Sequence, residues 1–375
     1  MEVTTMSNVK LKREPLFHIA KNDAMPFWKS WLIRVIAVVL ALVISGVVTV
    51  LFTGENPIRV YATMIEGAVG TERRVWGLLQ NIAMLLCVSL AVTPAFKMRF
   101  WNIGAEGQVL IGGLATASCM ILFGNTLPTI VLFPLMIVSS IVAGAIWAVI
   151  PAIFRAKWNT NETLFTLMMN YIAIQIVSFF VYKWSVPKGS GQIGVINNAT
   201  RAGWLPSIGN NDYIINILIV AVITALMYIY LKYSKQGYEI AVVGESENTA
   251  KYIGINVKKV IVRTMLLSGA ICGIAGLLLV SGTDHTLTRD TAAGRGFTAI
   301  MVSWLAKFNP LYMILTSFLV IFLQKGAIEI STVYSLNAAF SEIITGIIIF
   351  FIIGSEFFIN YKIKFHKPSK KGANV

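Results

Sequence analysis

Charged residues are scarce in this chain. They make up 13% of its 375 residues, whereas a soluble domain typically contains about 25%. Catalytic motifs are missing too: there is no Gly-Lys dipeptide, hence no G-x-x-x-x-G-K-S/T phosphate-binding loop, and neither G-x-S-x-G nor H-E-x-x-H occurs. We therefore expect a protein that is not an enzyme and that does not bind nucleotide phosphates through such a loop.

Cysteine and histidine are also rare, with three residues of each. The cysteines lie inside apolar runs, where they pack as small side chains, so we infer no disulfide. The histidines are far apart and have no partner at the spacing of metal ligands, so no metal site is expected. The residues concerned are Cys87, Cys119, Cys272, His18, His285 and His366.

Long apolar runs dominate the rest of the sequence, which is 56% hydrophobic and has a mean hydropathy of +0.73. About 20 apolar residues in a helix cross the hydrocarbon core, and lipid offers no partner to free backbone groups. The runs are too long for barrel strands. The sequence therefore predicts an all-α polytopic membrane protein with about ten transmembrane helices, at 31–53, 77–96, 107–124, 128–153, 163–182, 213–231, 264–282, 294–306, 310–326 and 341–358.

The net charge of +14 is distributed unevenly between the connections. Most of the 31 Lys and Arg residues fall in every second connection, which is the positive-inside pattern. It places both termini in the cytoplasm and explains the basicity by topology, so we expect no nucleic-acid binding. The expected organisation is a cytoplasmic basic arm (1–30), a transmembrane domain (31–358) and a cytoplasmic basic tail (359–375) in the cell membrane.

Two outer connections, 54–76 and 183–212, carry arginine, as does the segment that follows the seventh span. Arginine forms bidentate pairs with carboxylates, so these side chains could dock an acidic extracellular partner. Alternatively, they are solvated charges that keep the loops outside. The candidates are Arg73, Arg74, Arg201, Arg289 and Arg295.

The cytoplasmic connection 232–263 has a different character. A short helical pattern at 249–253 ends at Gly254, a common helix stop. We expect a short helix across the ends of the spans. It could fit a groove on a partner, or simply connect two spans.

Glycine interrupts two of the expected spans. The short eighth span begins at Gly294 and Gly296, followed by Phe297, and 102–108 opens the third span in a similar way. Such segments indicate broken helices that face a cavity. The two breaks are five spans apart and enter the membrane from opposite sides, which is the parity of an inverted repeat.

Polar residues at membrane depth are costly and therefore candidates for function. On the fifth span they fall within about 100° of one helix face, which indicates either the wall of a permeation pathway or hydrogen bonding between helices. Glu106, flanked by glycines, suggests a gating or packing role more than substrate binding. The stripe comprises Asn159, Glu162, Thr163, Thr166 and Asn170.

Four motifs, in this order, carry a resemblance to a known family. They are N-I-G-A-E-G-Q at 102–108, N-E-T-L-F-T-L-M-M-N-Y at 161–171, G-Y-E-I-A-V-V-G-E-S-E-N-T-A-K-Y-I-G-I at 237–255 and G-R-G-F-T-A-I at 294–300. From about residue 30 to 358 the chain resembles ABC-importer permeases of the simple-sugar and branched-chain amino acid superfamily. It is most similar to the nucleoside-type permeases that work with basic-membrane-lipoprotein binding proteins.

The resemblance implies the fold of the large vitamin-B12-type importers and import of nucleosides, or alternatively of simple sugars. It also implies a separate ATPase that binds ATP and Mg²⁺, a second permease subunit (a heterodimer, or else a homodimer) and an extracellular lipoprotein. The connection 232–263 would couple to the ATPase, and Gly294, Gly296 and Phe297 would join the polar stripe in the pathway. Gating or packing is expected of Asn102, Gly104, Glu106, Gly107 and Gln108, and coupling of Gly244, Glu245, Asn248, Ala250, Tyr252 and Gly254.

Two other classes compete with this interpretation. An ion-coupled secondary transporter would need acidic residues deep in the spans, and the candidates Glu106, Glu162 and Glu342 lie near span ends. A membrane scaffold would need neither the broken spans nor the polar stripe. The solute itself is not fixed by the sequence.

Overall fold

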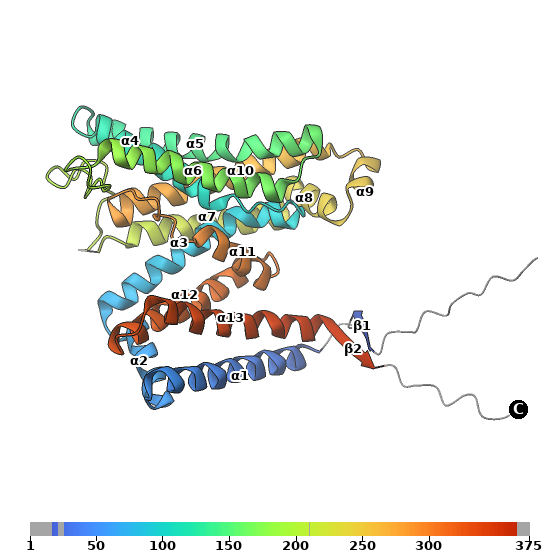
Figure 1. Cartoon of the computed structure of the whole chain (residues 1–375). Coiled ribbons are helices and arrows are strands. Elements are labelled where there is room, and N and C mark those ends of the chain that lie inside the picture. The colour runs from blue at the N-terminus through green and yellow to red at the C-terminus, as the bar shows by residue number, and fades with distance from the viewer. Residues whose placement is uncertain (1–16, 22–25, 210, 366–375) are drawn as a thin grey trace, which may run out of the picture. The chain divides into compact units, whose positions relative to one another are not determined.

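The computed structural model describes residues 17–21, 26–209 and 211–365 and divides into two compact units. One contains residues 61–336, and the other contains the described residues up to 60 and from 337 onward. Both are dominated by helices (Figure 1). Residues 1–16 and 22–25 of the expected basic arm and residues 366–375 of the expected tail lie outside the described residues.

The smaller unit is built on two helices, α1 (Phe27–Thr53) and α13 (Ala338–Asn360). They run side by side (Figure 1) and in opposite directions, because Arg34 near the start of α1 contacts Glu356 near the end of α13 at 2.5 Å. At the other end of the pair, the Phe52 and Phe340 ring centroids are 5.7 Å apart. A partly buried ion pair thus joins two predominantly apolar helices.

A two-stranded antiparallel sheet extends this unit. Strand β1 (Phe17–Lys21) precedes α1, and β2 (Tyr361–Phe365) follows α13 directly. The first residue of β1 lies opposite the last residue of β2. The sequence did not predict these strands, because each short segment becomes a strand only by pairing with the other, more than 300 residues away.

The larger unit contains the other helices. Their bounds are α2 (Pro57–Val69), which begins just before residue 61, α3 (Glu72–Lys97), α4 (Ala105–Phe123), α5 (Thr129–Trp158), α6 (Glu162–Trp184), α7 (Ile214–Tyr233), α8 (Lys235–Glu245), α9 (Glu247–Tyr252), α10 (Val257–Leu279), which continues as the π-helix η1 (Val280–Asp284), α11 (Arg295–Leu305) and α12 (Pro310–Val333).

Within the described residues, nine helices are long and apolar enough to cross a membrane. They lie at nine of the ten ranges predicted from the apolar runs, and the tenth range, 294–306, is occupied by α11, which has 11 residues. At 1.5 Å per residue α11 is about 16 Å long, roughly half a bilayer core. The prediction of an all-α polytopic protein with a short eighth segment is confirmed.

Helices α4, α5 and α10 pack closely against one another in the larger unit, with α5 along its edge (Figure 1). The α5–α10 contact is tight because small residues line it: a Cβ on Gly144 would overlap the Gly269 carbonyl oxygen, and one on Gly273 would overlap the Ser140 carbonyl oxygen. Small residues at such contacts let helix backbones approach closely in a membrane. Helix α3 packs against α10, α11 and α12, so it connects α10 to the short helix α11.

Candidate functional site

The connection that leads into α4 contains Asn102, whose fully buried side chain stabilises it through hydrogen bonds. Its amide nitrogen donates to the Ser268 hydroxyl on α10 at 3.2 Å. Its amide oxygen accepts from the backbone N–H of Gly104 at 3.0 Å and from the Gln108 side chain at 3.3 Å. A polar group buried in this way stabilises only the conformation that satisfies it. The hydrogen bonds of Asn102 therefore hold the turn before α4 in one conformation.

Helix α6 holds the same connection from the other side. The Asn170 amide donates to the Ile103 carbonyl and accepts from the Gly107 N–H, both at 2.8 Å. The Thr166 hydroxyl accepts from the Ile103 N–H at 3.1 Å. Both side chains are almost fully buried, at 2% and 0% exposure. In this structure these two residues of the polar stripe bind backbone between helices, and their role in a pathway remains a prediction.

The other three stripe residues lie at the junction of α5 and α6, where the Thr166 hydroxyl donates to the Glu162 carbonyl at 2.7 Å and the Thr163 carbonyl at 3.2 Å. Asn159 ends α5 in a left-handed conformation, and its amide oxygen accepts from Arg155 at 2.5 Å. Glu162 is 3.4 Å from the same guanidinium. Thr163 is half-buried beside it. Arg155 thus contacts both Asn159 and Glu162 where α5 meets α6.

The glycine-rich segments at the starts of α4 and α11 contact each other. One carboxylate oxygen of Glu106, in the first turn of α4, accepts from the Gly294 N–H and the other accepts from the Gly296 N–H, each at 2.7 Å. Gly294 is left-handed (φ +69°), and a Cβ on Gly296 would overlap the backbone nitrogen of Glu106. Sequence reasoning placed Glu106 in a gating or packing group and the glycines in the pathway. The structure brings both groups to one point, while the Phe297 side chain is turned outward and exposed.

The connection 232–263 folds as two helices rather than one. The expected helix at 249–253 is α9, whose first turn is capped by the Ser246 hydroxyl accepting from the Thr249 N–H at 3.2 Å. Gly254 follows α9 in the left-handed region at φ +85°, as expected of a helix stop. Helix α8 was missed, although the apolar residues Ile240 and Val243, three positions apart, were a signal for it.

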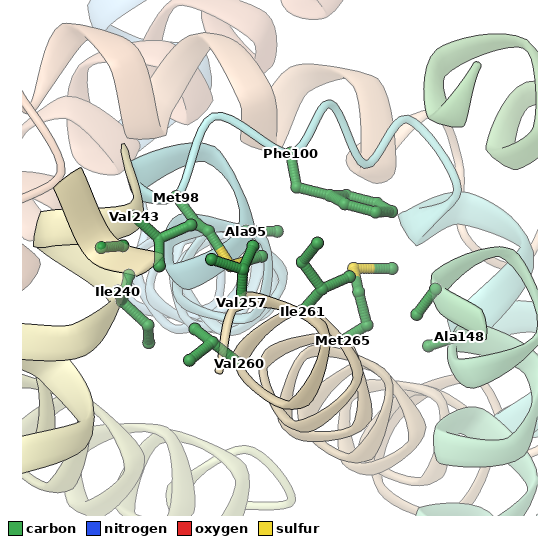
Figure 2. Close-up of a cluster of buried hydrophobic side chains, with 12 residues drawn as sticks. Ala95, Met98, Phe100, Ala148, Ile240, Val243, Val257, Val260, Ile261 and Met265 are labelled. Atoms are coloured by element: carbon green, nitrogen blue, oxygen red, sulfur yellow. The ribbon is translucent and has the colours of Figure 1, made fainter. Parts of the chain in front are cut away.

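A buried apolar cluster fixes α8 and α9 to the ends of the spans (Figure 2). Side chains of α8 and the start of α10 surround the end of α3 and the turn that follows it. Gly244 of α8 packs so closely on α3 that a Cβ would overlap the Lys97 carbonyl oxygen. Such packing makes the connection move with the spans as one body. The labelled residues are Ala95, Met98, Phe100, Ala148, Ile240, Val243, Val257, Val260, Ile261 and Met265.

The residues expected to couple to an ATPase divide into two sets. Gly244 and Ala250 are buried in the attachment just described. The other four face outward, and the Tyr252 side chain is 92% exposed. One set can anchor the connection and the other can contact a partner. The outward-facing set is Glu245, Asn248, Tyr252 and Gly254.

Comparison with known proteins decides the family. The profile described as "Branched-chain amino acid transport system / permease component" matches residues 75–353. The chain belongs to this family. It is therefore the membrane-spanning permease component of an ABC importer, which is not itself catalytic and works with an ATPase and other transporter components.

The relatives of the permease include a glucose permease protein and two guanosine permease proteins. The glucose ABC transporter permease protein TsgB13 of Haloferax volcanii is 28% identical over 95% of this chain and 94% of its own. The guanosine ABC transporter permease protein NupP of Bacillus subtilis is 29% identical over 92% of this chain and 98% of its own. A second guanosine permease protein of B. subtilis, NupQ, is 25% identical over 61% of this chain and 73% of its own.

One solved structure is also similar to the permease. PsaBC from Streptococcus pneumoniae in complex with Fab has a TM-score of 0.47 and 14% identity, covering 79% of this chain and 95% of that one.

The five arginines predicted to dock an outer partner differ in their surroundings. Arg74 is 2.7 Å from Glu329 of α12, which lies beyond the end at 326 expected for that span. Arg295 donates to the Asn81 amide oxygen of α3 at 3.0 Å. Arg73 and Arg201 are exposed, and Arg289 is exposed beside Asp290. Docking by these residues remains a prediction, with Arg73, Arg201 and Arg289 the accessible ones.

Sequence reasoning missed a polar cluster in the larger unit, between α3, α7 and η1. The Gln80 amide donates to the Thr283 hydroxyl at 2.5 Å, and the Asn216 amide donates to the same hydroxyl at 3.2 Å. Gln80 and Asn216 are buried. Their presence inside apolar spans was the available signal, but the π-helix that places Thr283 between them leaves no clear pattern in the sequence.

The long connection between α6 and α7 is attached to the end of η1. The Trp204 and His285 rings stack in parallel with centroids 3.8 Å apart. The Ile196 N–H donates to the His285 carbonyl at 2.8 Å. Burial lowers the pKa of His285 from its usual value near 6.5, with the Asp212 charge opposing that shift and the Arg201 charge adding to it.

We predict that acidification destabilises the permease through His285. Because its pKa is lower in the folded chain, the unfolded chain takes up a proton near pH 6.5 that the folded chain resists. The stabilisation is complete above about pH 7 and declines as the pH falls below about 6.5. Thermal unfolding of the purified complex at pH 7.5 and 5.5 measures the decline. His285→Phe keeps a ring against Trp204 and should reduce the pH dependence; an unchanged dependence would contradict this assignment.

Proposed function

We propose that this permease is one of two different membrane subunits of an ATP-driven nucleoside importer. The supporting observation is its unequal similarity to two guanosine permease proteins of one organism. It matches NupP over 92% of its length but NupQ over 61%. The chain then takes the place of the NupP-type subunit, and a NupQ-type chain completes a heterodimeric pore.

The subunit contacts differ on its two sides. An extracellular lipoprotein delivers solute to the outer connections, where Arg73, Arg201 and Arg289 are accessible to acidic side chains. On the cytoplasmic side, where both termini lie, the ATPase binds the outward-facing residues of α8 and α9. The ATPase holds ATP and Mg²⁺, and this chain needs no cofactor. Solute crosses beside the α4 and α11 breaks and α6.

A sugar importer is the second candidate, because TsgB13 matches this chain about as well as NupP does. The two proposals differ in solute and not in mechanism. An ion-coupled transporter is supported less well, because each oxygen of the buried Glu106 carboxylate already accepts a hydrogen bond from a backbone N–H group.

Uptake by the whole complex tests the proposal. The complex is purified from its native membrane through an affinity tag on this chain and reconstituted in proteoliposomes with its binding protein. We expect ATP-dependent uptake of tritiated guanosine that excess unlabelled uridine or adenosine reduces and glucose does not. Uptake of glucose alone would replace the nucleoside proposal with the sugar one. Uptake driven by a proton or Na⁺ gradient without ATP would reject both.

A labelling experiment tests the orientation. The native cysteines Cys87, Cys119 and Cys272 are buried, so a cysteine introduced at exposed Asn248 reports its own location. An impermeant maleimide should label Asn248→Cys only after the cells are opened, and Arg289→Cys already in intact cells. The reverse result would place the coupling connection outside and refute the proposed docking of the ATPase.

A further inference from the structure

The N-termini of two helices face each other inside the permease. Helix α4 begins at Ala105 and α11 begins at Arg295, and a Cβ on Gly296 would overlap the backbone of Glu106. The first turn of any helix carries N–H groups without helical partners and a partial positive charge. Two such ends at close range repel each other, and lipid supplies no counter-charge. Their meeting therefore requires a negative group between them.

Glu106 supplies that group. Its carboxylate belongs to the first turn of α4, where an acidic side chain offsets the positive end of its own helix. The same carboxylate binds two N–H groups at the start of α11, at 2.7 Å each. Hydrogen bonds to an ionised carboxylate are stronger than those between neutral groups. Glu106 thus neutralises two helix ends at once, and we call this contact the Glu106 latch.

The far end of α11 lies at the coupling face. Trp304, in its last turn, packs against Trp101 with ring centroids 5.5 Å apart. Both line a hollow of about 390 Å³ that is also bordered by Gly244 and Glu245 of α8. Helix α11 is therefore a short rigid rod between the Glu106 latch and the connection that the ATPase is proposed to contact. A displacement of α8 would be transmitted along this rod.

We propose that Glu106 is a positioning residue for transport: its latch fixes the start of α11 in one access state, and the latch opens and closes with each ATP-driven change of access. This inference rests on the proposed function as an ATP-driven importer. It differs from a purely structural role because it requires α11 to move relative to α4 during turnover. A carboxylate that merely stabilised the fold would keep the contact in every state.

The first test is the number of guanosine molecules imported per ATP hydrolysed by the complete complex in proteoliposomes. Glu106→Gln keeps the side-chain size but retains one acceptor oxygen for two N–H donors. We expect this ratio to fall at least tenfold while ATP hydrolysis is retained. Glu342→Gln, a change at an exposed carboxylate of α13, is the matched control and should preserve the ratio. If uptake and hydrolysis fall in proportion, or if neither changes, the latch has no part in coupling.

The second test needs no variant at Glu106. Phe297 in the first turn of α11 is 46% exposed, so Phe297→Cys provides a label next to the latch in an otherwise intact chain. Its rate of reaction with N-ethylmaleimide should change several-fold when ATP and vanadate trap the complex. A rate that is the same with and without trapping would show that the start of α11 does not move. Absence of ATP-driven uptake by the unmodified complex would instead refute the proposed function.

Discussion

Replacing Tyr252 with alanine is expected to weaken binding of the ATPase about 30-fold and to abolish most ATP-driven uptake. Exposed aromatic residues that become buried at the centre of an interface typically contribute about 2 kcal/mol or more, and about 1.4 kcal/mol corresponds to a factor of ten. Tyr252 is 92% exposed at the end of α9. The fold does not use its side chain, so its removal should affect the complex and not the permease.

The measurement is the amount of ATPase that co-purifies with the tagged permease, together with uptake in proteoliposomes. Tyr182→Ala, at the opposite end of the membrane-spanning unit and 68% exposed, serves as the control and should retain both. A Tyr252→Ala permease that holds the ATPase normally would show that the contact lies elsewhere on α8 or α9. Loss of the permease itself from the membrane would show that Tyr252 has a structural role.

Replacing Asn170 with leucine is expected to lower the free energy of unfolding by about 4 kcal/mol. Asn170 satisfies the Ile103 carbonyl and the Gly107 N–H, and each buried backbone group left without a partner costs about 1–3 kcal/mol. Water cannot replace the amide, because the site is 2% exposed. Unfolding of the purified permease in mixed detergent micelles, followed by circular dichroism, measures the loss.

This variant also separates the two interpretations of the polar stripe. If Asn170 only holds the break before α4, uptake should fall in proportion to the folded protein. If Asn170 also contacts solute, uptake should fall further than the loss of folded protein explains. Ser178→Ala on the same helix is the control, since the Ser178 hydroxyl bonds only to its own helix at Ile174. Its stability should change by less than about 1 kcal/mol.

The membrane spans were predictable because each is a local property of the chain. An apolar run long enough to cross lipid folds as a helix whatever its neighbours are, so α5 and α7 begin within one residue of the predicted ranges. The shortness of α11 was predictable for the same reason, since Gly294 and Asn309 delimit it in the sequence. Helix α8 was missed although Ile240 and Val243 gave a local signal for it, because so short a pattern does not show that its apolar face packs against the ends of three spans.

The residues of the candidate site were identifiable from the sequence, but their contacts were not. Helical periodicity placed Thr166 and Asn170 on one face, but periodicity cannot distinguish a face that meets water from one that meets polar backbone. The Glu106 latch joins residues 188 positions apart through backbone N–H groups, which every residue except proline possesses. No side-chain pattern at Gly294 could therefore reveal the partner. The Arg295 contact was not predictable for a related reason: its partner Asn81 lies on another span.

The pairing of β1 with β2 brings residues 17–21 next to residues 361–365, so Phe17 and Phe365 lie opposite each other. A short linker could join them, and new ends could be opened in the 185–213 connection to give a circular permutant. Likewise, a donor and an acceptor fluorophore attached at positions 17 and 365 would lie within energy-transfer range, and the energy transfer between them would decrease if the strands separated.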